Sequence, residues 1–144
     1  MTNILSTEKV KLGATVSNKE EAIRLAGQLL VDAGHVEVGY IEKMLEREAV
    51  LSTFMGNGIA IPHGTNESKA LVKSTGLSIV QIPNGVDYGD GQVAKLLIGI
   101  AASGNEHVEI LTNIAMIISE DENVDQILNA TSANEIIEIF EKGL

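Results

Sequence analysis

Three histidines, His35, His63 and His107, are the most distinctive residues of this 144-residue sequence that could carry chemistry. Cysteine is absent, which removes disulfides, thiolate metal sites and thiol nucleophiles from consideration. The histidines show no HxxH or HxxxH spacing, so a zinc site would have to be assembled from distant residues. The sequence also lacks a G-x-S-x-G elbow, a Walker A loop and a G-x-G-x-x-G fingerprint. These absences disfavour metal-dependent hydrolysis, serine hydrolysis and dinucleotide binding.

His63 lies in the segment Ile59-Ala60-Ile61-Pro62-His63-Gly64. In this segment a very short β-type run is followed by the histidine, which stands between a proline and a glycine. Pro62 restricts the backbone before the imidazole, and Gly64 would let a large partner group approach the ring. The pattern is typical of a histidine that is held stiffly and approached easily. From these residues alone, however, an ordinary histidine in a turn is the better interpretation.

The other two histidines are predicted to lie in different settings. A helical pattern begins after Ser103 or Asn105, either of which could cap it, and this places His107 in the first turn. Free N–H groups and the helix dipole favour an anion there. His35 follows Gly34 in a predicted loop and is expected on the surface.

The periodicity of apolar residues predicts the elements that must position these side chains. Ser17 and Glu20 have the spacing of a capping box, and Arg47 falls in the last turn of the second predicted helix, where a cation complements the dipole. Helices are predicted over 18–34, 38–49, 105–118, 123–129 and 132–140, and strands over 59–61, 76–82 and 95–102. Turn residues at 83–85 and 89–91 predict an antiparallel pair between the last two strands.

Composition limits the fold and the partners. The chain is 44% hydrophobic and 3% aromatic, which suits an aliphatic core in one α/β domain. Its net charge of −10 disfavours nucleic acid and would favour a partner with a basic face, although the charge could also serve solubility alone. No signal peptide and no apolar run of roughly 18 residues is present, so a cytoplasmic protein is expected.

One longer pattern is specific. It consists of Glu48, six intervening residues, Met55-Gly56, two more residues and then Ile59 to Gly64. This pattern resembles the signature of enzyme IIA domains of the mannitol/fructose class, from the bacterial sugar phosphotransferase system (PTS). Further stretches resemble the mannitol-specific branch: 19–23, 44–48, 97–102 and 105–107. The resemblance covers nearly the whole chain, so residues 1–144 are expected to form one PTS EIIA type-2 domain. It implies an α/β fold with a mixed, mainly parallel sheet of about five strands and helices on both faces.

The resemblance also implies a function. His63 would accept a phosphoryl group from the phosphohistidine of HPr and pass it to a cysteine of enzyme IIB, for uptake and phosphorylation of mannitol. His107 would be the second active-site histidine, and Arg47 would hold phosphoryl oxygens. No cofactor or metal would be needed, and contact with the membrane would be indirect, through the IICB permease.

Two alternatives remain open at this point. A relative of the nitrogen class would keep the phosphohistidine but control partner proteins by its phosphorylation state. A small-ligand-binding α/β domain would use the His63 loop only as the rim of its site. The apolar residues Phe54, Met55 and Ile59 could form a docking surface for partner proteins or belong to the core.

Overall fold

The computed structural model describes residues 4–103 and 106–143, so the predicted cap Asn105 lies outside the described residues. The helices are α1 (Lys19–Asp32), α2 (Tyr40–Val50), α3 (Glu106–Ile118), α4 (Asp121–Leu128) and α5 (Ala133–Gly143). The strands are β1 (Val10–Lys11), β2 (Phe54–Gly56), β3 (Ile59–Ala60), β4 (Gly76–Gly89) and β5 (Gln92–Ala101), and two short 3-10 helices are η1 (Thr7–Lys9) and η2 (Asn66–Leu71). All five predicted helices are confirmed. No described helix is long and apolar enough to cross a membrane.

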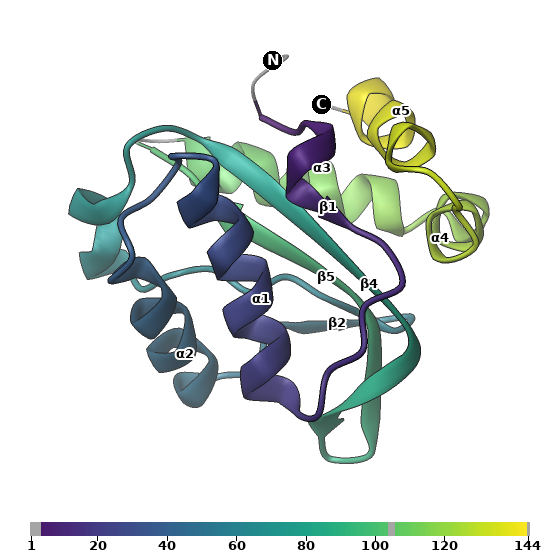
Figure 1. The fold of residues 1–144 in the computed structure, drawn as a ribbon, viewed down its shortest axis with the longest axis horizontal. Helices are drawn as coiled ribbons and strands as arrows, with labels where there is room; N and C mark the ends of the chain where they lie inside the picture. Colours follow the sequence, from purple (N-terminus) through teal and green to yellow (C-terminus); the bar gives the residue numbers. More distant parts are fainter. Residues whose placement is uncertain (1–3, 104–105, 144) are drawn as a thin grey trace.

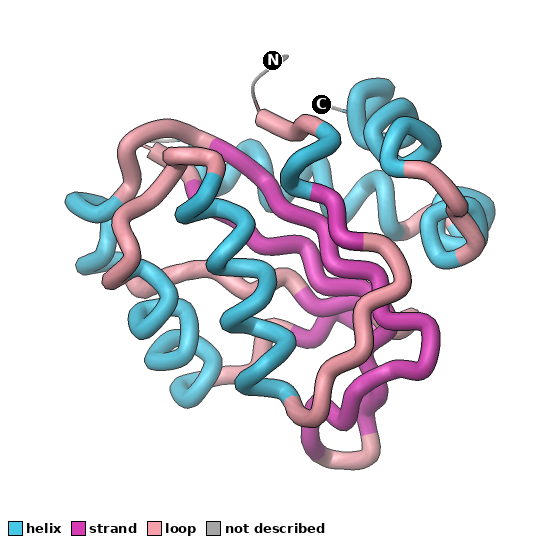
Figure 2. The backbone as a smooth tube through the Cα atoms, in the orientation of Figure 1, coloured by secondary structure: helices cyan, strands magenta, loops and turns pink. Residues whose placement is uncertain are grey.

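Among the described residues the five strands form one mixed sheet in the order β1-β4-β5-β3-β2. The pairs β1–β4 and β3–β5 are parallel, whereas β2–β3 and the long β4–β5 pair are antiparallel. The mixed sheet and the antiparallel pair of long strands are confirmed. Parallel pairing does not predominate, however, because two of the four pairs are parallel and each of these joins a short strand, β1 or β3, to a long one. Figure 2 shows the strands in magenta as a single sheet.

The predicted turn at Pro83-Asn84-Gly85 is wrong. β4 continues through these residues to Gly89, with a shift in its register to β5 between Gln81 and Val86. Gly85 has a φ of +74°, a value that glycine adopts without steric cost, so the three residues form an irregularity within the strand. The second predicted turn, at 89–91, is confirmed: the hairpin turns at Asp90-Gly91, where both residues have positive φ.

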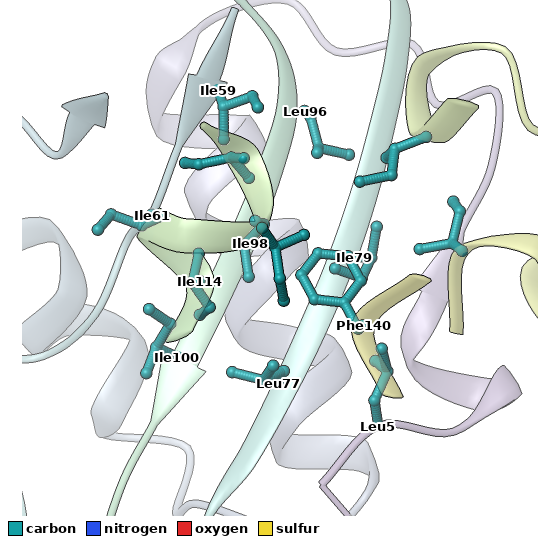
Figure 3. Packing of buried hydrophobic residues seen from close by; sticks show 14 of the residues in the cluster. Leu5, Ile59, Ile61, Leu77, Ile79, Leu96, Ile98, Ile100, Ile114 and Phe140 are labelled. Carbon is teal, nitrogen blue, oxygen red and sulfur yellow. The ribbon is translucent and has the colours of Figure 1, made fainter. Parts of the chain in front are cut away.

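Helices cover both faces of the sheet, as expected. Figure 1 shows α1 and α2 in front of the sheet and α3 behind it, with α4 and α5 beside α3. Successive residues of a strand point to opposite faces, so β5 supplies Leu96, Ile98 and Ile100 to the α3 side and Leu97 to the α1 side. Figure 3 shows the first of these two clusters, in which Ile79 and Ile98 pack with Phe140 of α5.

The position of α2 follows from how closely it packs on α1. A Cβ atom on Gly27 of α1 would lie 2.8 Å from the Cγ1 of Ile41, so only glycine fits between the helices at this point. The cap of α1 is Asn18, whose side chain accepts from the Glu21 amide (2.8 Å), and the predicted capping box of Ser17 is therefore displaced by one residue. Both ends of α2 lie beside the His63 segment, since the Tyr40 hydroxyl accepts from the Gly64 amide and Arg47 lines the same pocket as His63.

His35 is not a surface residue, contrary to the prediction. Its side chain is 6% exposed, and its two ring nitrogens lie 2.5 Å from Lys9 Nζ and 2.8 Å from Ser74 Oγ. The ring fills the space that a side chain at position 76 would occupy, since a Cβ on Gly76 would lie 2.4 Å from it. The hydrogen-bond partners of His35 and the space for its ring both come from distant parts of the chain.

Candidate active site

His63 follows β3 and pairs with Ile100 of β5 in an isolated parallel bridge. Its side chain is 7% exposed, and its Nδ1 lies 2.8 Å from the carbonyl oxygen of Ile61. A carbonyl can only accept, so Nδ1 carries the hydrogen and Nε2 of the neutral ring keeps a lone pair. The backbone therefore selects one tautomer of His63.

Gly64 is required for a different reason from the one expected. A Cβ atom at this position would lie 2.5 Å from both the Tyr40 ring and the Ser68 Oγ. The missing side chain thus gives room to two neighbours inside the protein rather than to an approaching partner. The prediction that the histidine is held stiffly agrees with the burial of His63.

His107 lies beside His63, as the first turn of α3 places it there. The centroids of the two imidazole rings are 5.1 Å apart, and the rings are inclined by 59°. The pKa of His107 is lowered by its burial and by the nearby charges of Lys69 and Arg47. A neutral ring always has one N–H to donate, so His107 offers a hydrogen-bond donor next to His63 at neutral pH.

Arg47 completes this group of side chains from the last turn of α2. Its Nη1 donates to the Leu51 carbonyl oxygen (2.7 Å), which satisfies a free carbonyl at the helix end. Arg47, His63 and His107 all line one pocket of about 620 Å³. The guanidinium has five N–H donors, so the bond to Leu51 leaves it able to bind an anion in the pocket. The structure therefore brings together the three predicted site residues.

The electrostatics of the pocket keep His63 neutral. Burial lowers its pKa first, and the neighbouring His107 and Arg47 lower it further. The Ile61 carbonyl and Glu48 act in the opposite direction but do not outweigh these effects. A neutral imidazole is the nucleophilic form, so the pocket favours the reactive state of His63 at pH 7.

Glu48 is a structural part of the site whose role the sequence did not reveal. Its buried carboxylate accepts from the Thr53 amide (3.1 Å) and hydroxyl (2.5 Å) and forms an ion pair with Lys19 (2.9 Å). Thr53 lines the same pocket as His63. These bonds fix the connection between α2 and β2, and Glu48 follows Arg47 directly. The only signal for Glu48 in the sequence was its position at the start of the pattern that runs to Gly64.

The apolar residues near the site divide between core and surface. Ile59 is fully buried, and Phe54 packs against Tyr88 with ring centroids 6.0 Å apart. Met55 is 47% exposed and Val50 is 81% exposed, and both line the rim of the His63 pocket. No three His, Asp or Glu residues of the described chain are grouped so that they could hold a metal ion.

Sequence similarity identifies the family. The family model described as "Phosphoenolpyruvate-dependent sugar phosphotransferase system, EIIA 2" matches residues 3–143. The chain belongs to this family. This EIIA chain is 58% identical over 137 residues to the mannitol-specific phosphotransferase enzyme IIA component of Geobacillus stearothermophilus, covering 95% of this chain and 94% of that protein. It is 56% identical over 137 residues to the component of the same name from Bacillus subtilis strain 168, covering 95% and 96%.

Solved structures of similar chains agree with this assignment. The EIIA chain superposes with a TM-score of 0.90 and 38% identity on a chain from the complex of enzyme IIAMTL and phosphorylated enzyme IIBMTL of Escherichia coli, covering 96% of this chain and 97% of that one. Nitrogen regulatory protein IIA-Ntr of Neisseria meningitidis gives a TM-score of 0.79 at 26% identity, covering 95% and 96%. The mannitol-specific structure is thus more similar than the nitrogen regulatory one.

Proposed function

We propose that this EIIA chain is a mannitol-specific phosphocarrier in which His63 receives a phosphoryl group from HPr and passes it to a cysteine of enzyme IIB. Support for the sugar comes from the identity of 58% and 56% to two mannitol-specific components. The E. coli complex with phosphorylated enzyme IIBMTL supports the second partner. These partners would place the protein in the cytoplasm, with the membrane reached only through the permease.

One observation carries the role of His63: the bond from Nδ1 to the Ile61 carbonyl leaves Nε2 with its lone pair in a pocket shared with a guanidinium and a second imidazole. In the transfer, Nε2 forms a bond to phosphorus as the P–N bond of the donor phosphohistidine breaks. The donor imidazole leaves with the electron pair of that bond. Nδ1 keeps its hydrogen throughout, so the Ile61 carbonyl stabilises the positive charge that develops on the His63 ring.

Arg47 and His107 would act on the phosphoryl group without bonding covalently to it. The guanidinium can hold two phosphoryl oxygens in a fixed geometry and offset their charge. The His107 N–H can donate to a third oxygen, which stabilises the spread charge of a phosphoryl group in transfer. Their role is electrostatic, so removing either should slow the transfer and leave the acceptor intact.

The residues at the rim of the pocket are suited to the docking of partner proteins. Val50 and Met55 are apolar and exposed beside the buried acceptor, which is the arrangement of an interface with an apolar centre. The net charge of −10 would attract a partner with a basic face and raise its rate of encounter. Both features fit a carrier that must meet two proteins in turn at the same histidine.

The experiment that tests the acceptor is phosphorylation by enzyme I, HPr and phosphoenolpyruvate, followed by intact-mass measurement. We expect one acid-labile phosphoryl group on the unaltered protein and none on His63→Ala. Arg47→Ala and His107→Ala should still be labelled, but more slowly, by about tenfold or more. If His63→Ala is labelled as fully as the unaltered protein, the acceptor is a different residue. If the unaltered protein takes up no phosphoryl group, the small-ligand-binding alternative is favoured.

Reconstitution distinguishes the carrier from a nitrogen-class regulator. Labelled protein is mixed with membranes that hold a mannitol permease lacking its own IIA, and mannitol phosphate is measured. We expect sugar phosphorylation that depends on His63. Full labelling of His63 without transfer to mannitol would favour the regulator and would contradict the proposed sugar.

A further inference from the structure

The hydroxyl of Tyr40 lies at a break in the pairing between β5 and the segment that carries His63. It donates a hydrogen bond to the Ile100 carbonyl oxygen (2.8 Å) and accepts one from the Gly64 amide (2.9 Å). On the other side of His63, the Ile100 amide donates directly to the Pro62 carbonyl oxygen (3.0 Å). His63 is therefore held to β5 by a direct bond before it and by a hydroxyl-bridged link after it.

A regular parallel pairing would not need this hydroxyl. When His63 pairs with Ile100 in a parallel sheet, the residues before and after His63 make the two hydrogen bonds to Ile100. The Gly64 amide would then donate directly to the Ile100 carbonyl. Here the Tyr40 hydroxyl occupies both bonding positions. The hydroxyl therefore bridges the Gly64 amide and the Ile100 carbonyl at the point where the pairing of this segment with β5 ends.

The surroundings of Tyr40 leave this arrangement little freedom. The residue is 4% exposed, and its ring and the Ser68 hydroxyl fill the space where Gly64 has no side chain. The pKa of the Tyr40 hydroxyl is raised by burial, although the Gly64 amide acts to lower it. The hydroxyl keeps its hydrogen at neutral pH and remains a donor to Ile100.

We propose that Tyr40 is a positioning residue for phosphoryl transfer, whose hydroxyl sets the backbone of residues 61–64 and so fixes the orientation of the His63 ring. This inference rests on the proposed role of His63. The bond that selects the tautomer joins Nδ1 to the Ile61 carbonyl of the same segment. Tyr40 begins α2 and Arg47 lies in its last turn, so a single helix sets both the acceptor and the cation.

The test compares Tyr40→Phe with Tyr88→Phe, which removes the hydroxyl of the other tyrosine of the chain. Tyr88 is also buried, but its hydroxyl lies 3.5 Å from Thr53 Oγ1 and touches no part of the His63 segment by a hydrogen bond within the described chain. Single-turnover transfer from phospho-HPr is measured over a range of donor concentrations. Nitrogen chemical shifts of His63 report the fraction of the ring with hydrogen on Nδ1.

For Tyr40→Phe we expect the maximal rate to fall by about tenfold to a hundredfold, as for a reacting group misplaced by a fraction of an ångström to one ångström. The donor concentration at half-maximal rate should stay the same, and the Nδ1–H fraction of His63 should fall. Tyr88→Phe should leave the maximal rate, the donor concentration at half-maximal rate and the Nδ1–H fraction of His63 unchanged. An unchanged maximal rate and tautomer in folded Tyr40→Phe would overturn the inference, even if its stability were lower.

A second variant keeps the test decisive if Tyr40→Phe does not fold. Gly64→Ala retains the Tyr40 hydroxyl group but forces the Tyr40 ring or the segment to move, because the new Cβ would lie 2.5 Å from the ring. It should show the same loss of maximal rate and of the Nδ1–H tautomer. Normal transfer by Gly64→Ala would refute the inference. Failure of the unaltered protein to be labelled would instead refute the proposed function.

Discussion

Substituting Glu48 by glutamine would test how the wall of the candidate active site is held. The buried carboxylate accepts from the Thr53 amide and hydroxyl and pairs with Lys19 at 2.9 Å. Glu48→Gln keeps the shape of the side chain but removes its charge and replaces one acceptor oxygen by an NH2 group. That NH2 group would face a donor in either orientation, because both Thr53 and Lys19 direct hydrogens at the carboxylate.

The size of the effect follows from these contacts. A hydrogen bond to a charged group contributes about 1.5–3 kcal/mol, and the glutamine oxygen can keep only part of what two carboxylate oxygens accept. The Lys19 side chain is 31% exposed, so water replaces some of the lost ion pair and the cost stays below that of a fully buried charge left alone. We expect Glu48→Gln to lower the free energy of unfolding by about 2–3 kcal/mol.

Urea unfolding at pH 7, followed by circular dichroism, measures this loss. With an m value of about 2 kcal/mol per molar urea, the midpoint should fall by roughly 1 M. Glu46→Gln is the matched control, because Glu46 lies on the same helix and its exposed carboxylate pairs with Lys43 at 3.1 Å. The control should lose about 0.5 kcal/mol or less. Equal losses in the two variants would refute the reasoning.

The pH dependence gives a second check on Glu48. Burial acts to raise its pKa, but hydrogen bonds from Thr53, Lys19 and Ser52 outweigh that effect and hold the pKa below its ordinary value of 4.5. A carboxylate with a lowered pKa stabilises the fold fully above its unfolded pKa and loses that contribution as the pH falls through the folded one. The difference in stability between the unaltered protein and Glu48→Gln should therefore shrink below pH 4.5. A difference that stays constant there would contradict the charge-based explanation.

Two further predictions concern the pocket and the fold. Arg47→Ala should raise the pKa of His63, since the guanidinium is one of the charges that lower it, and the loss of labelling rate at acid pH should begin at a higher pH. Arg47→Lys should keep most of the original pH profile, and identical profiles for all three proteins would contradict the assigned cause. Gln81→Leu should lower the free energy of unfolding in urea by about 2–4 kcal/mol, because the buried amide donates to the Ile127 (3.0 Å) and Ala130 (3.1 Å) carbonyls. A loss below about 1 kcal/mol would show that these carbonyls find other partners.

The sequence predicted the elements whose apolar pattern is long enough to be periodic. The five helices and the long strands β4 and β5 belong to this group. β1 and β2 have two and three residues, which is too short for alternation to show. β1 also depends on β4, a partner strand far along the chain, whereas β2 pairs with the neighbouring β3. The irregularity at Gly85 looked like a turn because turns and bulges use the same residues, and only the pairing with β5 distinguishes them.

The features of the site can be divided in the same way, into those that a local pattern predicted and those that depend on the folded chain. The positions of His63 after a short strand and of His107 in a first helical turn came from local patterns. The function of Arg47 came only from the resemblance, since a helix-end cation has the same local pattern, and it does donate to the Leu51 carbonyl. The tautomer of His63 and the bridging role of Tyr40 depend on backbone atoms of residues 61, 64 and 100, which only the folded chain brings together. Burial of His35 required both Lys9 and the missing side chain of Gly76.

In the proposed transfer, the surroundings of His63 would act in opposite ways on the empty and the phosphorylated ring. Before transfer, Arg47 and His107 help to keep the pKa of His63 low, so the ring remains neutral and nucleophilic. Once a phosphoryl group is attached, its negative oxygens would face the Arg47 guanidinium and the N–H of neutral His107, and the positive charge of Arg47 that opposed protonation would stabilise the adduct. A stronger field would hold the phosphoryl group too tightly to be passed on, whereas a weaker one would leave the imidazole protonated at mildly acidic pH. A carrier that must both accept and release therefore needs a field of intermediate strength. In this chain the Arg47 guanidinium also donates to the Leu51 carbonyl, so only part of its set of N–H donors would be free to bind the phosphoryl group.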